Sequence, residues 1–118
     1  MKTYKDLDVW KKGREVGVDI YSTTSIFPPE ERFGLISQLR RAAISVPANV
    51  AEGHGRNSSK DTIQFLHIAR GSLYEVETMV LISEDLNFLN ETISVRLINK
   101  ITDCIKKLNG LINYFASK

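Results

Sequence analysis

The amino-acid sequence predicts an all-α protein, an up-down-up-down antiparallel four-helix bundle. Apolar residues recur at helical spacings of three and four in four separate stretches, and no stretch alternates as a half-buried strand does. The connections between these stretches are short, which makes neighbouring helices antiparallel. The 118 residues are expected to form one domain, 1–118. Its helices are expected at about residues 6–24, 29–53, 59–86 and 91–115.

The first expected helix covers about residues 6–24, with Asp6 or Asp8 as its cap. Its last residues, Ser22–Ser25, form helices poorly and end it before the Phe27–Pro28 pair. The seam that faces the bundle is Val9, Gly13, Val16 and Ile20, and the apolar surface is widened by Trp10, Val18 and Tyr21.

The second expected helix opens at Pro28 and Pro29, because the first turn does not need their missing N–H groups. Gly34 marks a short break near its start, and Gly53 is expected to end it in the left-handed conformation. Pro47 lies in mid-helix, where it removes a hydrogen bond and is expected to kink the helix. The seam is Ile36, Leu39, Ala43, Val46 and Val50.

The third and fourth helices have expected caps at Ser58 and Asn90, and Asn87 can end the third. Gly71 lies inside the third helix, which predicts a close approach between helices. The third seam is Leu66, Ala69, Leu73, Val76 and Val80, broadened by Ile63, Phe65, Ile68 and Ile82. The fourth apolar set is Val95, Ile98, Ile101, Ile105, Leu108, Ile112 and Phe115.

Polar residues replace leucine-like residues along the second and third helices. They are Arg41, Ser45, Asn49, Glu52, Arg70 and Glu75. One interpretation is an internal network in which Arg41 or Arg70 pairs with Glu52 or Glu75 across the bundle, since buried charges persist only when paired. The other is an interface between subunits, where polar groups fix the register of a seam that could otherwise slip. For Ser45 and Asn49, a further role is to satisfy a carbonyl group that Pro47 leaves free.

Basic residues gather in two places. Lys2, Lys5, Lys11, Lys12 and Arg14 lie on and before the first helix, and His54, Arg56 and Lys60 lie at the turn between the second and third. They are either ordinary solvated surface or a phosphate-binding surface, and antiparallel packing is expected to merge the two groups. The net charge of +2 is too small to indicate nucleic acid by itself.

No motif indicates catalysis, a metal or a cofactor. The sequence lacks a G-x-S-x-G elbow, phosphate-binding glycine loops and the Glu-x-x-His pairs of di-iron bundles, so the expectation is a non-enzymatic protein without cofactors. The one cysteine, Cys104, forms no intrachain disulfide. No apolar run reaches membrane-spanning length and the N-terminal stretch does not resemble a signal peptide, so the expected location is cytoplasmic, with no membrane partner.

Three segments carry a family resemblance: DLDVWKKGREV (Asp6–Val16), the run Phe27–Arg56 with its Arg-Arg-Ala-x-x-Ser-x-Pro-x-Asn-x-Ala-Glu-Gly pattern, and FLHIARGSLYEVET (Phe65–Thr78). They resemble the four-helix-bundle proteins encoded in intervening sequences of 23S rRNA genes. The chain is similar also to the accessory protein of diversity-generating retroelements, a basic pentamer that works with a reverse transcriptase and nucleic acid. The resemblance implies a homo-oligomer, expected to be a pentamer, and assigns no catalytic residue.

These observations favour a non-enzymatic homo-oligomer that binds RNA or a nucleoprotein as an accessory factor. The residues predicted to contact nucleic acid are Lys11, Lys12, Arg14, His54, Arg56 and Lys60. The alternative is a protein-interaction scaffold with no nucleic-acid role, marked by an exposed apolar groove. An enzyme with a pocket around Glu52 and Glu75 is the third and weakest hypothesis.

Overall fold

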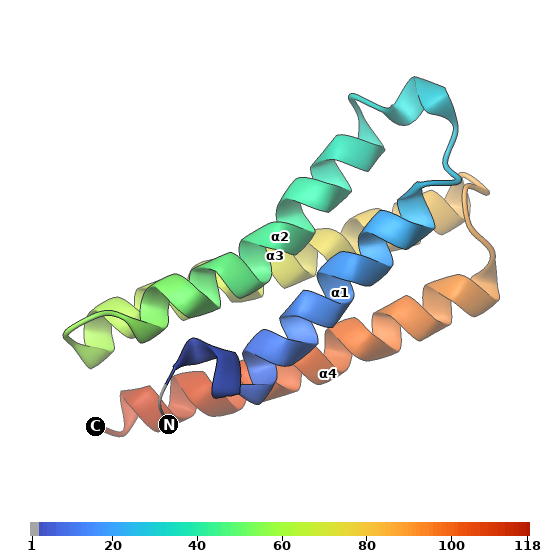
Figure 1. The fold of residues 1–118 in the computed structure, drawn as a ribbon. Coiled ribbons are helices and arrows are strands. Elements are labelled where there is room, and N and C mark those ends of the chain that lie inside the picture. The colour runs from blue at the N-terminus through green and yellow to red at the C-terminus, as the bar shows by residue number, and fades with distance from the viewer. Residues whose placement is uncertain (1–2) are drawn as a thin grey trace.

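The computed structural model describes residues 3–118, which form four long helices joined by short connections (Figure 1). Two single-turn 3-10 helices, η1 (Tyr4–Asp6) and η2 (Pro29–Glu31), precede the first and second of them. The long helices are α1 (Asp8–Thr24), α2 (Leu35–His54), α3 (Ser59–Asp85) and α4 (Glu91–Ala116). The all-α prediction is confirmed, since residues 3–118 contain no strand.

Each helix packs against its neighbour in sequence, and α4 also packs on α1, which completes the bundle. In Figure 1 the connection between α2 and α3 and the C-terminal end of α4 lie at one end of the bundle, and the other two connections lie at the opposite end. The described chain is elongated, with extents of 45 × 24 × 20 Å. No helix within residues 3–118 has the apolar length that a membrane crossing requires.

The start of α1 differs from the prediction. The helix begins at Asp8 after extended Leu7, and no side chain caps it, so the predicted Asp6 or Asp8 cap of this helix is wrong. Asp6 instead completes the capping box of η1, whose N-cap is Thr3: the Asp6 carboxylate accepts the N–H of Thr3 at 3.2 Å, and the Thr3 hydroxyl accepts the N–H of Lys5 at 3.1 Å. The capping pattern was present in the sequence but belongs to the turn before the helix.

The start of α2 also moves. The prolines open the single turn η2, and α2 itself begins at Leu35, so the predicted start at residue 29 is wrong while the predicted break at Gly34 is confirmed. Gly34 has φ −108° and ψ −115°, which no helix allows. Glu31 links the two pieces, because its carboxylate accepts the N–H of Leu35 at 3.1 Å.

The predicted N-caps of α3 and α4 are confirmed, and so is the predicted end of α3 near Asn87. Ser58 accepts the N–H of Asp61 at 3.2 Å and Asn90 accepts the N–H of Ile93 at 2.8 Å. Beyond the end of α3, Asn87 adopts φ 63°, the left-handed conformation that asparagine tolerates better than most residues.

The roles predicted for two glycines are wrong. Gly53 stays inside α2 with a negative φ, and its missing side chain allows a close approach to α3. A Cβ there would lie 3.0 Å from the Cβ of Phe65 and 3.2 Å from the carbonyl oxygen of Thr62. The Thr62 hydroxyl donates to the Gly53 carbonyl at 2.9 Å, which joins the two helices at this point. Gly71, expected at a close approach, instead faces open space.

The core follows the predicted seams of α1, α2 and α3. Leu39, Val46, Leu73 and Val76 are at most 1% exposed, like most of the core. On α4 the prediction is partly wrong, because Val95 is 51% exposed. The residues of α4 that face the core include three that the predicted set omitted: Ser94, Leu97 and Cys104.

The proline of α2 lies where α1 and α2 cross closely. Figure 1 shows that α2 bends along its length, as a proline inside the helix leads us to expect. A Cβ at Gly13 of α1 would lie 3.2 Å from Val46 and 3.5 Å from Pro47, so the small residue permits the crossing. The Asn49 amide donates to the carbonyl of Ser45 at 2.8 Å, not to the Ala43 carbonyl that Pro47 crowds.

Candidate nucleic-acid interface

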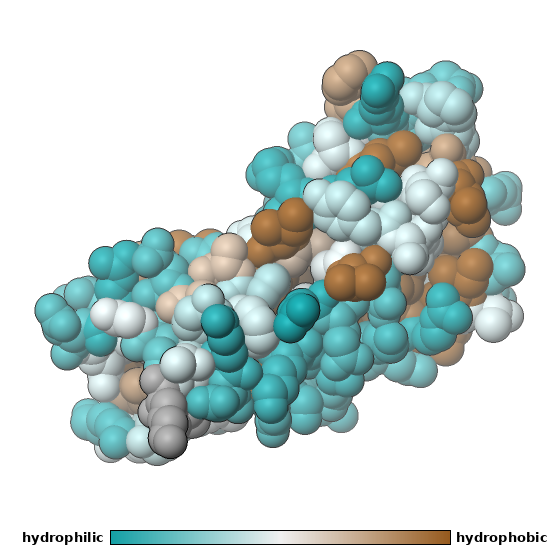
Figure 2. All heavy atoms as spheres, viewed as in Figure 1, coloured by the Kyte–Doolittle hydropathy of each residue, from teal (hydrophilic) through white to brown (hydrophobic). Residues whose placement is uncertain are grey.

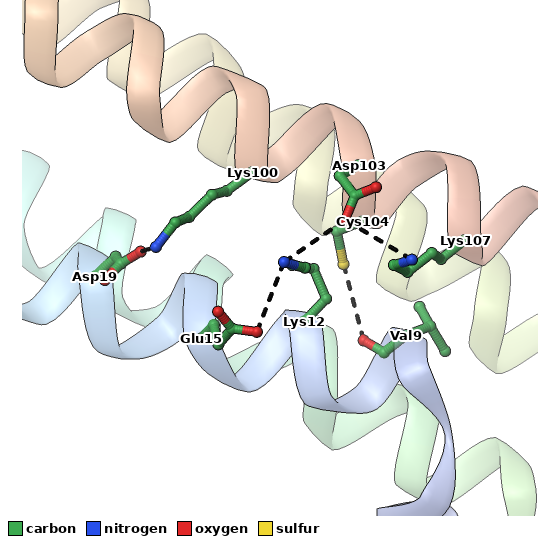
Figure 3. A network of polar contacts seen from close by, with 8 residues as sticks. All are labelled: Val9, Lys12, Glu15, Asp19, Lys100, Asp103, Cys104 and Lys107. Carbon is green, nitrogen blue, oxygen red and sulfur yellow. Dashed lines mark hydrogen bonds and ion pairs between the residues drawn. The ribbon is translucent and has the colours of Figure 1, made fainter.

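Among the residues of α1 that are predicted to contact nucleic acid, Lys12 forms ion pairs with carboxylates of the protein itself. Its ammonium group lies 3.6 Å from the carboxylate of Glu15 and 3.6 Å from that of Asp103 on α4, and its side chain is only 25% exposed (Figure 3). Lys107 lies 3.9 Å from the same Asp103 carboxylate. Lys12 therefore contributes mainly to the contact between α1 and α4, and the sequence alone did not reveal its partner on the distant helix.

Lys11 and Arg14 are exposed, and within residues 3–118 neither has a carboxylate partner. Together with Lys100, Val18 and the carboxylates Glu15 and Asp19 they line a shallow hollow of about 340 Å³ between α1 and α4. Lys100 donates to Asp19 at 2.5 Å (Figure 3), and Arg14 lies over the ring of Trp10 at 5.6 Å. Lys11 and Arg14 are thus the predicted cations of α1 that remain available to a ligand. Lys2 lies outside the described residues.

The second basic group lies where α2 passes to α3. Arg56 is partly engaged, because its guanidinium lies 3.2 Å from the Glu52 carboxylate and 4.5 Å from the centre of the Phe65 ring. Lys60 is exposed at the first turn of α3 and has no carboxylate partner in the described chain. His54 is half-buried at the last turn of α2.

This end of the bundle has two hollows that the sequence did not predict, the first mainly apolar and the second of mixed lining. The first, of about 380 Å³, is lined by Leu7, His54, Leu111, Tyr114, Phe115 and Lys118. The second, of about 450 Å³, is lined by Ser59, Lys60, Ile63, Gln64, His67, Phe115, Ala116 and Lys118. They share Phe115 and Lys118, so the end of α4 separates them. The sequence signal for these hollows is the pair Tyr114–Phe115 close to Lys118, which antiparallel packing brings beside the α2–α3 turn.

The two basic groups line different hollows. Lys11 and Arg14 line the hollow between α1 and α4, whereas His54 and Lys60 line those at the end of the bundle. Leu7, just before α1, lines one of these hollows together with His54, so the start of α1 lies beside this turn, and the merging of the two groups into one surface stays a prediction. The fold also joins His54 and Lys60 to the aromatic end of α4.

The predicted network of charges across the bundle is wrong. Arg41 bonds to Gln38 on its own helix, and Arg70 donates to Asn109 of α4 at 2.8 Å. Glu52 pairs with Arg56, as described above. Glu75 is exposed and lies without an ion-pair partner in the part of the chain that the structure describes.

Between α2 and α3 the side-chain connection is neutral. The Ser72 hydroxyl of α3 donates to the Ser45 hydroxyl of α2 at 2.9 Å, and the Asn49 amide also donates to that hydroxyl at 2.9 Å. Glu52 and Glu75 are exposed, so they form no enclosed carboxylate pocket of the kind that a perturbed catalytic pair requires. Of the six predicted polar residues, Ser45 and Asn49 thus belong to the neutral contact, Arg70 bonds to α4, and the other three are exposed: Arg41, Glu52 and Glu75.

An apolar groove lies between α1 and α2. It has a volume of about 410 Å³, and its lining includes Gly17, Val18, Tyr21, Ile44 and Pro47. Val18 is 62% exposed and Ile44 is 49% exposed, so the groove presents a continuous apolar patch to solvent. Figure 2 shows hydrophobic surface over α1 and α2 and over the end where α1 passes to η2.

The single thiol is chemically quiet. Burial, with a smaller contribution from the nearby Asp103 carboxylate, raises the pKa of Cys104 to about 12. Because the thiolate is the nucleophile and the metal ligand, Cys104 is a packing residue at neutral pH. Within residues 3–118 no three His, Cys, Asp or Glu side chains gather where they could hold a metal ion.

The fold and this surface define a class: an all-α four-helix bundle whose one end combines cations with aromatic hollows. The chain belongs to the 23S rRNA-intervening sequence protein family, whose profile matches residues 5–110. Its structure is similar to the crystal structure of a protein of unknown function from the S23 ribosomal protein family of Bacteroides thetaiotaomicron VPI-5482. The TM-score is 0.79, with 24% identity over 88% of this chain and 97% of that one, a likeness that shows the fold. No curated protein matches the chain.

Proposed function

We propose that this protein is a non-enzymatic, homo-oligomeric accessory factor of the cytoplasm that binds RNA, or a nucleoprotein, through phosphate contacts. The observation that carries the proposal is the separation of charge along the bundle. Nucleic-acid affinity comes largely from the neutralisation of phosphates by lysine and arginine, so the arrangement of charge decides more than its total.

The two ends of the bundle carry opposite charge. Residues 52–61 and 106–118, at one end, include five lysines or arginines and two carboxylates, Glu52 and Asp61. Residues 25–34 and 84–91, which form the connections at the opposite end, include five carboxylates and one arginine. A polyanion is attracted to the first end and repelled by the second, although the net charge is only +2.

The cations best suited to bind phosphate are those without a competing carboxylate. Lys11, Arg14 and Lys60 meet this condition within residues 3–118, whereas Lys12 and Arg56 are paired. An ion pair must be broken, or shared, before its cation can neutralise a phosphate. We therefore expect Lys11, Arg14 and Lys60 to contribute more to binding than Lys12 and Arg56.

The groove between α1 and α2 supports self-association. Exposed aliphatic and aromatic side chains in a continuous hollow favour burial against a second protein surface. Ile44 and Val18 lie on opposite walls of this groove, on α2 and α1. A homo-oligomer, which the family resemblance predicts to be a pentamer, would bury this surface and repeat the basic end in each copy.

Size-exclusion chromatography with light scattering, with and without nuclease, tests both parts of the proposal. We expect a mass above that of the 13.3 kDa monomer and, before nuclease treatment, co-eluting nucleic acid. Purified RNA should bind at low ionic strength, and the affinity should fall steeply between about 50 and 200 mM salt. A monomer refutes the self-association, and no retention of RNA at low salt refutes the nucleic-acid role.

The apolar groove also favours the second candidate, a protein-interaction scaffold without nucleic acid. In that case a protein partner should remain bound after nuclease treatment, and Ile44→Ser should release it. The two functions are distinguished by Lys60→Gln, which should weaken an RNA complex and leave a complex at the groove unchanged. Lys60 lies in the first turn of α3 and is not among the residues that line the groove.

A further inference from the structure

The two hollows beside the α2–α3 turn have the composition of a site for unpaired nucleotides. We propose that this end of the bundle binds a single-stranded segment of RNA, with bases against Tyr114 and Phe115 and phosphates against Lys60 and Lys118. The inference rests on the proposed function, and it adds the class of nucleic acid and the residues that contact its bases and phosphates. Tyr114, Phe115 and Lys118 lie outside the basic groups visible in the sequence.

The aromatic side chains are placed as a stacking surface. Tyr114 is 53% exposed, and its ring lies 5.1 Å from that of Phe115 in an edge-to-face arrangement. Phe115 packs partly on the core, which fixes its position, and it lines both hollows. The ammonium group of Lys118 lies 4.6 Å from the centre of the Tyr114 ring. An exposed aromatic ring next to a cation is the combination that single-strand binding proteins use for successive bases.

The hollows have a suitable size and lining for this ligand. Volumes of about 380 and 450 Å³ lie at the lower end of the range for small-ligand pockets, as expected for a base or a nucleotide. Leu7 and Leu111 give the first hollow an apolar wall, against which the face of a base loses little hydration. In the second hollow, Gln64 and Ser59 supply the polar groups that hydrogen-bond to base edges.

The charges around the hollows match a phosphate backbone. Lys60 and Lys118 have no carboxylate partner within residues 3–118. The chain has two histidines, His54 and His67. One histidine lines each hollow, His54 the first and His67 the second. Phosphates on either side of a stacked base can therefore meet a cation or an imidazole in each hollow.

Base faces are accessible only in unpaired RNA. A duplex stacks its bases on one another and presents phosphates and 2′-hydroxyl groups, so it could use the lysines but not the aromatic rings. The geometry thus predicts a preference for single strands, loops or ends over duplex RNA. Electrostatic contacts alone would not produce this preference.

Fluorescence anisotropy with two labelled probes tests the inference on the full-length protein. The probes are a single-stranded RNA of about 12 nucleotides and a blunt duplex of the same length. We expect tighter binding of the single strand, and we expect Tyr114→Leu to weaken it by roughly 5- to 100-fold while duplex binding stays unchanged. The matched control is Tyr74→Leu, a tyrosine of similar exposure on α3, which should bind both probes as wild type does.

A second variant separates charge from stacking. Lys118→Gln should weaken both probes, whereas Arg32→Gln, at the acidic end, should weaken neither. A 2-aminopurine placed in the single strand should report stacking with the wild-type protein and lose that signal with Tyr114→Leu. Wild-type binding of the single strand by Tyr114→Leu, or a preference for duplex, overturns this inference alone. Failure of both probes to bind at low salt overturns the proposed function as well.

Discussion

Two glycine substitutions should change stability in opposite directions. Gly53→Ala places a Cβ 3.0 Å from the Cβ of Phe65 and 3.2 Å from the carbonyl oxygen of Thr62. Neither atom lies at the end of a flexible side chain, so α2 and α3 must move apart to accept the methyl group. Gly71→Ala places the same methyl group in open space on the surface of α3.

The magnitudes follow from two terms. Replacing glycine by alanine inside a helix gains about 1 kcal/mol of helix propensity. At Gly71 nothing opposes this gain, so unfolding free energy should rise by about 0.5–1 kcal/mol, or roughly 4 °C in Tm for a chain of this length. At Gly53 overpacking costs about 1–3 kcal/mol and outweighs the gain, which leaves a net loss of about 1 kcal/mol. Separation of the helices also lengthens the Thr62–Gly53 hydrogen bond.

Urea unfolding followed by circular dichroism measures both changes. The proteins are compared at one fixed concentration, because self-association makes apparent stability depend on concentration. Equal or greater stability of Gly53→Ala would refute the close approach of α2 and α3. A loss of stability in Gly71→Ala would refute the open environment of Gly71 and indicate that another protein surface packs on this face.

The remaining predictions concern caps, an ion pair and the thiol. Ser58→Ala and Asn90→Ala should each lower the unfolding free energy by about 1 kcal/mol, measured by the same urea titration, because each removes a side-chain acceptor from a helix start. Lys100→Ala should cost less than about 1 kcal/mol, since its pair with Asp19 is partly exposed, and the loss should shrink in high salt. Cys104 should react with iodoacetamide at pH 8 only as fast as the protein unfolds; rapid labelling of the folded protein would contradict its burial. Its pKa rises from 9.0 to about 12 on folding, so the native state binds the proton more tightly and stability should decline as pH rises above about 9 in an alkaline unfolding series.

Local signals in the sequence predicted the four long helices, although the starts of α1 and α2 differ from the prediction. Hydrophobic period, cap residues and breakers determine where a helix lies, and they predicted α3 and the caps Ser58 and Asn90 closely. They could not determine which face of a broadly apolar helix meets its neighbours. On α4 both Val95 and Leu97 are apolar, and only packing against the other helices exposes the first and buries the second.

The candidate site was predicted only in part, because its residues come from distant segments. His54 and Lys60 were visible as a basic turn, but Tyr114 joins them only after four helices have packed. Likewise, Lys12 is predicted from the sequence to contact nucleic acid, and its ion pair with Asp103 forms only where α1 and α4 pack together. Pairing between helices is the information that a single sequence does not contain.

The separation of charge has a kinetic consequence for an elongated molecule. Carboxylates and cations at opposite ends of a body 45 Å long give it a permanent electric dipole along its axis. In the field of a polyanion such a body rotates before it touches, so most encounters would begin with the cationic end facing the ligand. The association rate would then exceed that of an evenly charged bundle of the same net charge, and the advantage would vanish once the Debye length became much shorter than the molecule.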